Sequence, residues 1–349
     1  MTRIYLDHAA TTPLRPEAAE AMRLGFEIWA NPSSPHAEGR KARAALEDAR
    51  ERVKQALGWD GECIFTSGAS EALAIGLGRA RAERRIVSAV EHDAVFRAAP
   101  DAEVVPVGGD GMVDRDRLAV ALGEGRAVCA IQHVNSETGT MQDFEGLRDL
   151  ANDNGSLLLA DCSQSASRLG MPDADMLVVS AHKVGGPIGI GALLVRDFAM
   201  LAPDGGQERG YRQGTENMPG ALGMATALEV SRLPGGWTTP EVIEAFDRAR
   251  AAIRNEGGTE IATGSRSSGS ISSFAHPAMS AQAQLIRLDA MGFAVSAGSA
   301  CSSGTLKKSR VLHAFGIDDD KASRTIRVSI GWNTTPEDLN AFAEAWRSL

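Results

Sequence analysis

The segment MLVVSAHKVGGPIGIG, residues 176–191, decides how this chain is interpreted. Its first four residues are apolar, which is typical of a buried strand, and the run leads through Ser180 and His182 to Lys183. Glycines follow at once. A buried strand that delivers a lysine to a glycine-lined opening indicates a carbonyl cofactor, held on that lysine as a Schiff base.

Lysine is rare in this chain, which contains six residues of this type. Lys183 alone directly follows an apolar strand-like run. The other five lie in charged or loop-like surroundings, where lysines are usually solvated: Lys41, Lys54, Lys307, Lys308 and Lys321. Lys183 is therefore the candidate for cofactor attachment.

The composition is that of a globular protein. A length of 349 residues predicts roughly two domains, and the hydrophobic content of 43% is ordinary. The net charge of −9 argues against nucleic acid as a bulk partner. No run of ~18 apolar residues occurs, so no membrane span is expected. The opening MTRIYLDHAATT lacks the apolar region of a secretory signal, and we expect a cytoplasmic location.

The cysteines are widely spaced and form no CxxC pair: Cys63, Cys129, Cys162 and Cys301. This pattern fits free thiols in a reducing compartment rather than a disulfide framework or a zinc site. No metal site is expected.

Alternating strand and helix patterns predict an α/β fold. Residues 38–57 form a charged, alanine-rich helical pattern that Gly58 ends. Seven short apolar runs are strand candidates, which favours a largely parallel seven-stranded sheet flanked by helices: 63–66, 85–90, 104–107, 127–134, 156–161, 175–180 and 191–196. Further strands at 270–275 and 325–330, and helices near 280–291 and 336–347, predict a smaller α+β domain. We place the large domain at 14–230 and the small one at 1–13 and 231–349.

Ligands gather at the carboxyl ends of the strands in such a sheet. After the strand at 63–66, the segment Thr66–Ser70 and the helix from Glu71 offer hydroxyls, a glycine and free N–H groups. This combination suits a phosphate, although an ordinary strand–turn–helix cap has the same pattern.

Asp161 ends an apolar strand, where a lone carboxylate needs a cationic partner. The protonated ring nitrogen of pyridoxal 5'-phosphate (PLP) would serve, while the alternative is a cap on the next helix. Gln164 is placed to reach a ring hydroxyl.

Other strand ends and loops carry candidate ligands. His92 follows the strand at 85–90 and suits stacking on a planar cofactor or proton transfer, or a structural role. Asn135 suits either a turn or a hydrogen bond to a ligand. The glycine-rich, polar segment 205–217 is typical of a binding loop, without naming the ligand.

The last third holds a different pattern. Residues 296–305 read SAGSACSSGT, in which small residues surround Cys301. A thiol on such a loop suits a nucleophile that moves between two positions, or is incidental to a linker. Arg327 lies in the strand pattern TIRVSI and suits a bidentate carboxylate clamp, or is a surface arginine.

Together these features resemble the cysteine desulfurases, the NifS/IscS-like branch of the class V aminotransferase-like PLP enzymes of fold type I. The resemblance covers nearly the whole chain and rests on ordered motifs: YLDHAATTP (5–13), ANPSSPHAEGR (30–40), TSGASEA (66–72), EHDAV (91–95), NSETGTMQ (135–142), ADCSQ (160–164), SAHKVGGP (180–187), GGQERGYRQGTEN (205–217), SAGSACSSGTLKKSRVL (296–312) and IRVSIGWNTTPED (326–338).

The resemblance implies cofactor roles. Lys183 would carry PLP, His92 would stack on its ring, and Asp161 would pair with the ring nitrogen. Gln164 and Asn135 would contact the ring hydroxyl or the substrate. Four residues would hold the phosphate: Ala69, Ser70, Ser180 and His182.

The resemblance also implies the remaining roles. Thr215 would reach the phosphate of the neighbouring subunit's site, which implies a homodimer. Arg327, together with Asn135, would bind the substrate carboxylate. Cys301 would carry sulfur as a persulfide.

The implied activity converts L-cysteine into L-alanine and passes sulfur to an acceptor protein, such as an iron–sulfur scaffold, for cluster assembly or other thio-cofactors. One alternative is a selenocysteine lyase or another PLP lyase or transaminase of small amino acids. A transaminase needs no thiol, so Cys301 argues against it. The other alternative is a non-catalytic scaffold, against which the complete residue set argues.

Overall fold

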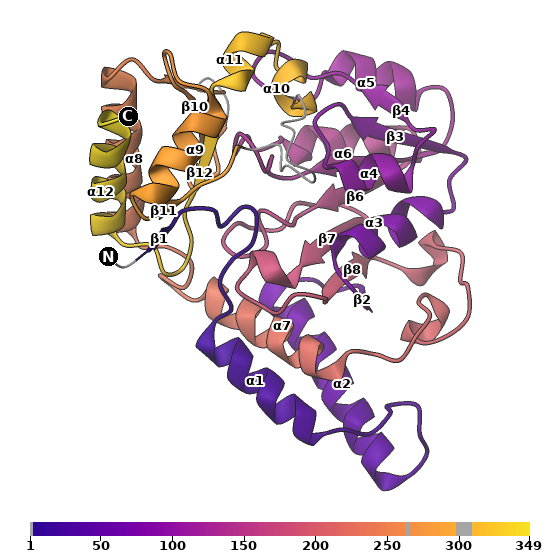
Figure 1. Ribbon diagram of the computed structural model, residues 1–349. Coiled ribbons are helices and arrows are strands. Elements are labelled where there is room, and N and C mark those ends of the chain that lie inside the picture. The colour runs from indigo at the N-terminus through magenta and orange to yellow at the C-terminus, as the bar shows by residue number, and fades with distance from the viewer. Residues whose placement is uncertain (1–2, 263–265, 298–308) are drawn as a thin grey trace.

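The protein is described here by a computed structural model that covers residues 3–262, 266–297 and 309–349 (Figure 1). Its largest sheet has the strand order β2-β8-β7-β6-β5-β3-β4. The bounds of these strands are Glu62–Thr66 (β2), Arg84–Ser88 (β3), Glu103–Val105 (β4), Ala127–Gln132 (β5), Leu157–Asp161 (β6), Met176–Ser180 (β7) and Gly191–Val195 (β8).

Helices cover both faces of this sheet. Residues of α1, α2, α5, α6 and α7 share one buried core with the strands, and residues of α3 and α4 share the other. Figure 1 shows α1 and α2 packed against α7. The helices are Pro16–Glu27 (α1), Ala37–Leu57 (α2), Ala69–Gly78 (α3), Asp93–Ala98 (α4), Arg115–Leu122 (α5), Phe144–Asp153 (α6) and Met218–Arg232 (α7).

A separate core lies beneath two small sheets, β12-β10-β9 and β1-β11. The strands are Ile4–Tyr5 (β1), Thr259–Glu260 (β9), Ile271–Ala275 (β10), Phe293–Ala294 (β11) and Thr325–Ser329 (β12). The helices of this part are Pro240–Asn255 (α8), Ala281–Ala290 (α9), Arg310–Ala314 (α10), Asp319–Ser323 (α11) and Pro336–Arg347 (α12). The domain division at residues 13 and 230 stays a prediction.

The sequence patterns agree with this architecture. All seven expected strands of the large sheet form, and the expected helix over 38–57 is α2, which ends at Gly58 in a left-handed conformation with φ 63°. The α/β class with a mostly parallel seven-stranded sheet is confirmed. Within this sheet, β8 runs antiparallel to both of its neighbours. The reason is that residues 181–190, which join β7 to β8, are too few for a helical crossover.

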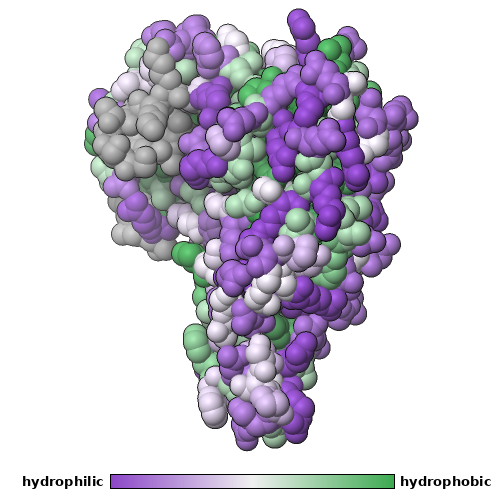
Figure 2. Space-filling model, turned by 90° about the vertical axis from the view of Figure 1, so that its right-hand side faces the viewer, coloured by the Kyte–Doolittle hydropathy of each residue, from purple (hydrophilic) through white to green (hydrophobic). Residues whose placement is uncertain are grey.

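The surface is mixed in character. Hydrophilic residues dominate the face shown in Figure 2, with apolar residues dispersed among them. Among the described residues, no helix has the combination of length and apolar character that crossing a bilayer requires.

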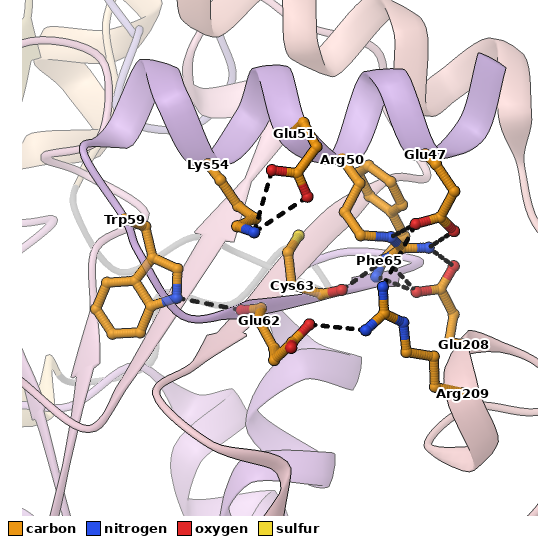
Figure 3. Close-up of polar contacts among 10 residues, drawn as sticks. All are labelled: Glu47, Arg50, Glu51, Lys54, Trp59, Glu62, Cys63, Phe65, Glu208 and Arg209. Atoms are coloured by element: carbon orange, nitrogen blue, oxygen red, sulfur yellow. Dashed lines mark hydrogen bonds and ion pairs between the residues drawn. The ribbon is translucent and has the colours of Figure 1, made fainter. Parts of the chain in front are cut away.

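A buried ion pair fastens the segment 205–214 onto α2 and β2 (Figure 3). The Arg50 and Glu208 side chains are only 3% and 1% exposed, and Arg50 Nη1 lies 2.7 Å from Glu208 Oε2. Arg50 also donates to the Cys63 carbonyl at 2.5 Å, and the Phe65 amide donates to Glu208 Oε2 at 2.9 Å. These contacts hold Glu208 in the left-handed region, at φ 49°, which costs a non-glycine residue free energy.

We predict that Glu208→Gln lowers the free energy of unfolding by about 3 kcal/mol, because it removes the buried carboxylate partner of Arg50 and leaves only the more exposed Glu47, 3.3 Å from Arg50 Nε. Urea denaturation followed by circular dichroism measures this change. The matched control is Glu62→Gln, which removes a more exposed pair with Arg209. It should cost less than about 1 kcal/mol. Equal effects of the two variants would contradict a dominant role for the buried pair.

Candidate active site

The expected ligand residues lie where the parallel strands end. Asp161 and Ser180 are the last residues of the adjacent strands β6 and β7. Residues 181–183 form a short 3-10 helix, η1, that turns the chain away from the sheet and carries Lys183. His92 follows β3 and begins α4. The sheet therefore brings groups from distant parts of the sequence to one edge.

The Lys183 amine is held by the N-terminal segment. Its Nζ donates to the carbonyl oxygens of Ala9, at 2.5 Å, and Ala10, at 2.8 Å. Burial first, and then the Arg327 charge, lower the pKa of Lys183 to about 8, against the opposing effect of the Asp161 carboxylate. An amine with this pKa is partly neutral near physiological pH, as nucleophilic attack on a carbonyl requires.

Gln164 and His182 support the same segment. Gln164 Nε2 donates to the Ala9 oxygen at 2.8 Å, so Gln164 and Lys183 share an acceptor. His182 Nδ1 lies 3.1 Å from Thr11 Oγ1. Burial, followed by the nearby Lys183 charge, lowers the pKa of His182 to about 4, so the ring is neutral at pH 7.

Asp161 and His92 interact electrostatically within the site. Asp161 is 8% exposed, and its Oδ1 accepts a hydrogen bond from the Ser163 amide at 2.9 Å. One carboxylate oxygen therefore forms the local turn. His92 Nδ1 accepts from the Ala94 amide at 3.1 Å and caps α4, while much of the residue is exposed. Partial desolvation lowers the pKa of His92, and the Asp161 charge opposes that shift.

Asn135 is fully buried, and its side chain forms hydrogen bonds within the surrounding turn. Its Oδ1 accepts from the amides of Glu137 and Thr138, both at 2.9 Å, and its Nδ2 donates to the Val90 carbonyl at 3.3 Å. These hydrogen bonds support the turn-forming interpretation of Asn135. A role toward a ligand stays a prediction.

The start of α3 has the features of an anion cradle. Gly68 precedes the helix with φ 151°, no side chain caps this end, and the space beside its Cα is open. The amides of Ala69 and Ser70 have no hydrogen-bond acceptor among the described residues. Thr66 and Ser180 both pair with Gly191 across the sheet, so this helix start lies close to Ser180.

Arg327 is buried, which excludes the surface-arginine interpretation. On β12, its Nη2 donates to Asp7 Oδ1 at 2.7 Å and its Nη1 to the Ser136 carbonyl at 2.9 Å. Its Nε is buried without a partner among the described residues. The sequence analysis did not assign Asp7, although Asp7 lies in the quoted motif YLDHAATTP. Only the fold shows that residues 7 and 327 meet.

Glu91 is a second residue that sequence reasoning missed. Its Oε1 accepts from Ser88 Oγ at 2.5 Å and from the Gln132 amide at 2.9 Å. Burial raises the pKa of Glu91 to about 8, and the Asp161 charge adds to the shift. Its position before His92 in the motif EHDAV was the available signal.

One expected residue, Thr215, is not joined to this cluster. Thr215 is exposed and lines a separate hollow of about 320 Å³ beside Trp29 and Phe26. Cys301 lies outside the described residues. The other thiols are free and buried, and burial raises the pKa of each: Cys63, Cys129 and Cys162.

The donor set fits a phosphorylated aldehyde such as PLP. It combines a buried amine of lowered pKa, free helix amides for a phosphate and a carboxylate for a ring cation. In the described part of the chain, no group of three or more His, Cys, Asp or Glu side chains is arranged to hold a metal ion.

Comparisons with known proteins show the family of this chain. Residues 4–342 match the model of the aminotransferase class-V family. A cysteine desulfurase IscS from Dictyoglomus turgidum is 36% identical, over 97% of this chain and 92% of its own length. The crystal structure of a NifS-like protein from Rickettsia africae has a TM-score of 0.89 at 25% identity, over 99% of both chains. SspA in complex with cysteine has a TM-score of 0.81 at 28% identity, over 96% of this chain and all of its own.

This chain belongs to the aminotransferase class-V family, and within it to the cysteine desulfurases. The fold-type I assignment made from the sequence motifs is confirmed by the same similarities.

We predict that the Lys183 amine of the cofactor-free chain titrates near pH 8. As the pH rises through about 8 the amine loses its proton, so its acylation rate should reach half its maximum there. An ordinary exposed lysine does so near ~10.4. Peptide mass spectrometry after brief acylation measures the rate, with the exposed Lys41 as a reference within the chain.

The variant Asp161→Asn tests the cause of this shift. The Asp161 carboxylate raises the pKa of Lys183, so its removal should move the labelling midpoint to lower pH. A wild-type midpoint near ~10 would contradict the burial argument.

Proposed function

We propose that this protein is a PLP-dependent cysteine desulfurase that converts L-cysteine into L-alanine and holds the sulfur as a persulfide on Cys301. The observation that carries the proposal is the buried Lys183 amine, whose pKa is lowered to about 8 beside the Asp161 carboxylate. The family supports the activity, because named cysteine desulfurases are similar over nearly the whole chain.

The chain's own residues suit the cofactor roles. Lys183 would attach PLP, the Asp161 carboxylate would keep the ring nitrogen protonated, and the exposed His92 ring would be free to stack. Gln164 contacts the ring hydroxyl. When bound, PLP draws electron density away from the substrate Cα. The free amides at the start of α3, with the side chains of Ser70, Ser180 and His182, would hold its phosphate.

Arg327 holds the substrate carboxylate. Its guanidinium already has an ordered position, set by Asp7 and the Ser136 carbonyl, and its Nε has no other partner among the described residues. Asn135 contributes from the adjacent turn. Lys183 Nζ removes the proton from the substrate Cα, for which an amine near neutrality is suited.

Cys301 takes the sulfur. Its thiolate attacks the substrate sulfur, a sulfur–sulfur bond forms, and the Cβ–sulfur bond breaks. The electrons of that bond stay on the carbon fragment, which is protonated and leaves as alanine. The described thiols are unsuited to this step, since burial keeps them protonated: Cys63, Cys129 and Cys162.

The persulfide sulfur then passes to an acceptor protein in the cytoplasm, for which we propose an iron–sulfur scaffold. We also propose that the protein is a homodimer in which Thr215 reaches the neighbouring subunit's site. The surface beside Thr215 supports this arrangement, because Trp29 and Phe26 are 79% and 66% exposed there.

Replacing Cys301 by Ser separates this function from its alternatives. The variant should still bind cysteine and change the visible spectrum of the cofactor, because Lys183 and Asp161 are intact. It should release no alanine from cysteine and carry no persulfide. Alanine analysis and mass spectrometry of the intact protein measure both products. Release of keto acid by the wild type would instead indicate a transaminase, and a colourless protein would indicate a scaffold.

The control for this test is Cys129→Ala, which removes a buried thiol and should retain alanine release. Persulfide on Cys63, Cys129 or Cys162 of the wild type, with Cys301 unmodified, would overturn the assignment of the sulfur carrier.

The homodimer has its own test. Trp29→Asp places a charge on the exposed apolar surface, so the protein should elute as a monomer in size-exclusion chromatography with light scattering. Desulfurase activity should fall when the dimer is lost, because Thr215 of one subunit then no longer reaches the site of the other. Ile286→Asp, on the equally exposed surface of α9, is the control and should leave the dimer intact. A Trp29→Asp dimer of wild-type stability would exclude this surface as the interface.

A further inference from the structure

A second hollow, of about 350 Å³, lies between the end of α7 and the segment that follows β6. It shares no lining residue with the site around Lys183. Its lining residues are Arg168, Leu169, Ser231, Arg232, Leu233, Gly235, Trp237 and Thr238. These residues include two arginines and no acidic side chain.

Arg168 is the unusual residue of this hollow. Its Nε and Nη2 are buried and make no hydrogen bond within the described residues, and the side chain takes part in no ion pair there. Its guanidinium carbon lies 5.9 Å from the Trp237 ring centroid. Burial lowers the pKa of Arg168 to about 10, and no carboxylate offsets the shift. A buried cation without a counter-charge costs free energy that one aromatic face does not return.

The remaining polar groups of the hollow are also donors. Arg232 is half-buried and donates from Nη1 to the carbonyls of Ala166, at 3.4 Å, and Leu169. Burial lowers its pKa as well, again without a carboxylate partner. Trp237 Nε1 is buried and lacks an acceptor among the described residues. Two arginines and a tryptophan therefore line one hollow whose lining residues carry no negative charge.

We propose that this hollow binds a small oxyanion, a phosphate or a carboxylate, between Arg168 and Arg232. A planar guanidinium with free nitrogens suits such a ligand, because it donates paired hydrogen bonds to two oxygens. The ligand supplies the missing charge. Trp237 connects this hollow to the site around Lys183. Its ring packs edge-on against His8, and the next residue, Ala9, accepts a hydrogen bond from Lys183.

The experiment is a calorimetric titration of the PLP-loaded enzyme with inorganic phosphate and, separately, with sodium acetate. Sodium chloride keeps the ionic strength constant, and PLP loading keeps the titrant out of the cofactor phosphate site. We expect saturable binding at one site per chain. Phosphate binding alone identifies a phosphoryl ligand, and acetate binding alone identifies a carboxylate. Arg168→Met should weaken the binding about tenfold or more, and Arg117→Met, which alters an exposed arginine, should not.

Thermal unfolding separates a binding role from a structural one. In chloride, Arg168→Met should melt no lower than the wild type, because it removes an uncompensated buried charge. In phosphate or acetate, the wild type should gain more stability than the variant, whose smaller gain reports the general effect of the salt. Should Arg168→Met fail to fold, Arg232→Gln carries the same titration. The proposal is overturned if the wild type binds neither anion saturably, or if the folded variant binds as tightly as the wild type.

Discussion

The short connection between β7 and β8 is the constraint on which the site depends. Residues 181–190 turn the chain back beside the strand it has just left, so β8 runs antiparallel and Lys183 stays at the carboxyl edge of the sheet. The same edge receives Asp161 from β6. Because β6 and β7 are fully buried, Asp161 and Lys183 are positioned by the core of the sheet rather than by surface loops.

The N-terminal segment joins the two parts of the molecule at that edge. The Ala9 carbonyl accepts from Lys183 and Gln164 of the large sheet, while the Ala9 amide donates to Ser329 Oγ of β12. Asp7 pairs with Arg327 on the same strand. A stretch of a few residues thus sets the position of the lysine relative to the arginine that we assign to the substrate.

Much of this was predictable from periodicity and turn residues. The strands of the large sheet are apolar runs bounded by glycines or polar residues, with Asp161 at the end of one strand and His92 in the turn after another. The ion pair of Asp7 with Arg327 was not predictable, since it joins residues 320 positions apart. Strands of two residues, such as β1 and β11, carry no periodic signal. The proposed roles of Thr215 and Cys301 stay predictions, because Thr215 lies apart from the Lys183 cluster and Cys301 lies outside the described part of the chain.

The burial of the three described cysteines affects where sulfur can be transferred within the protein. A persulfide transfers its outer sulfur to any accessible thiolate. An enzyme that carries a persulfide would therefore lose this sulfur to its own cysteines if they were reactive. Cys63, Cys129 and Cys162 each lie within the sheet core, protonated and shielded from solvent. None of these three thiols is therefore accessible to receive sulfur, and the same burial shields them from oxidants in solution.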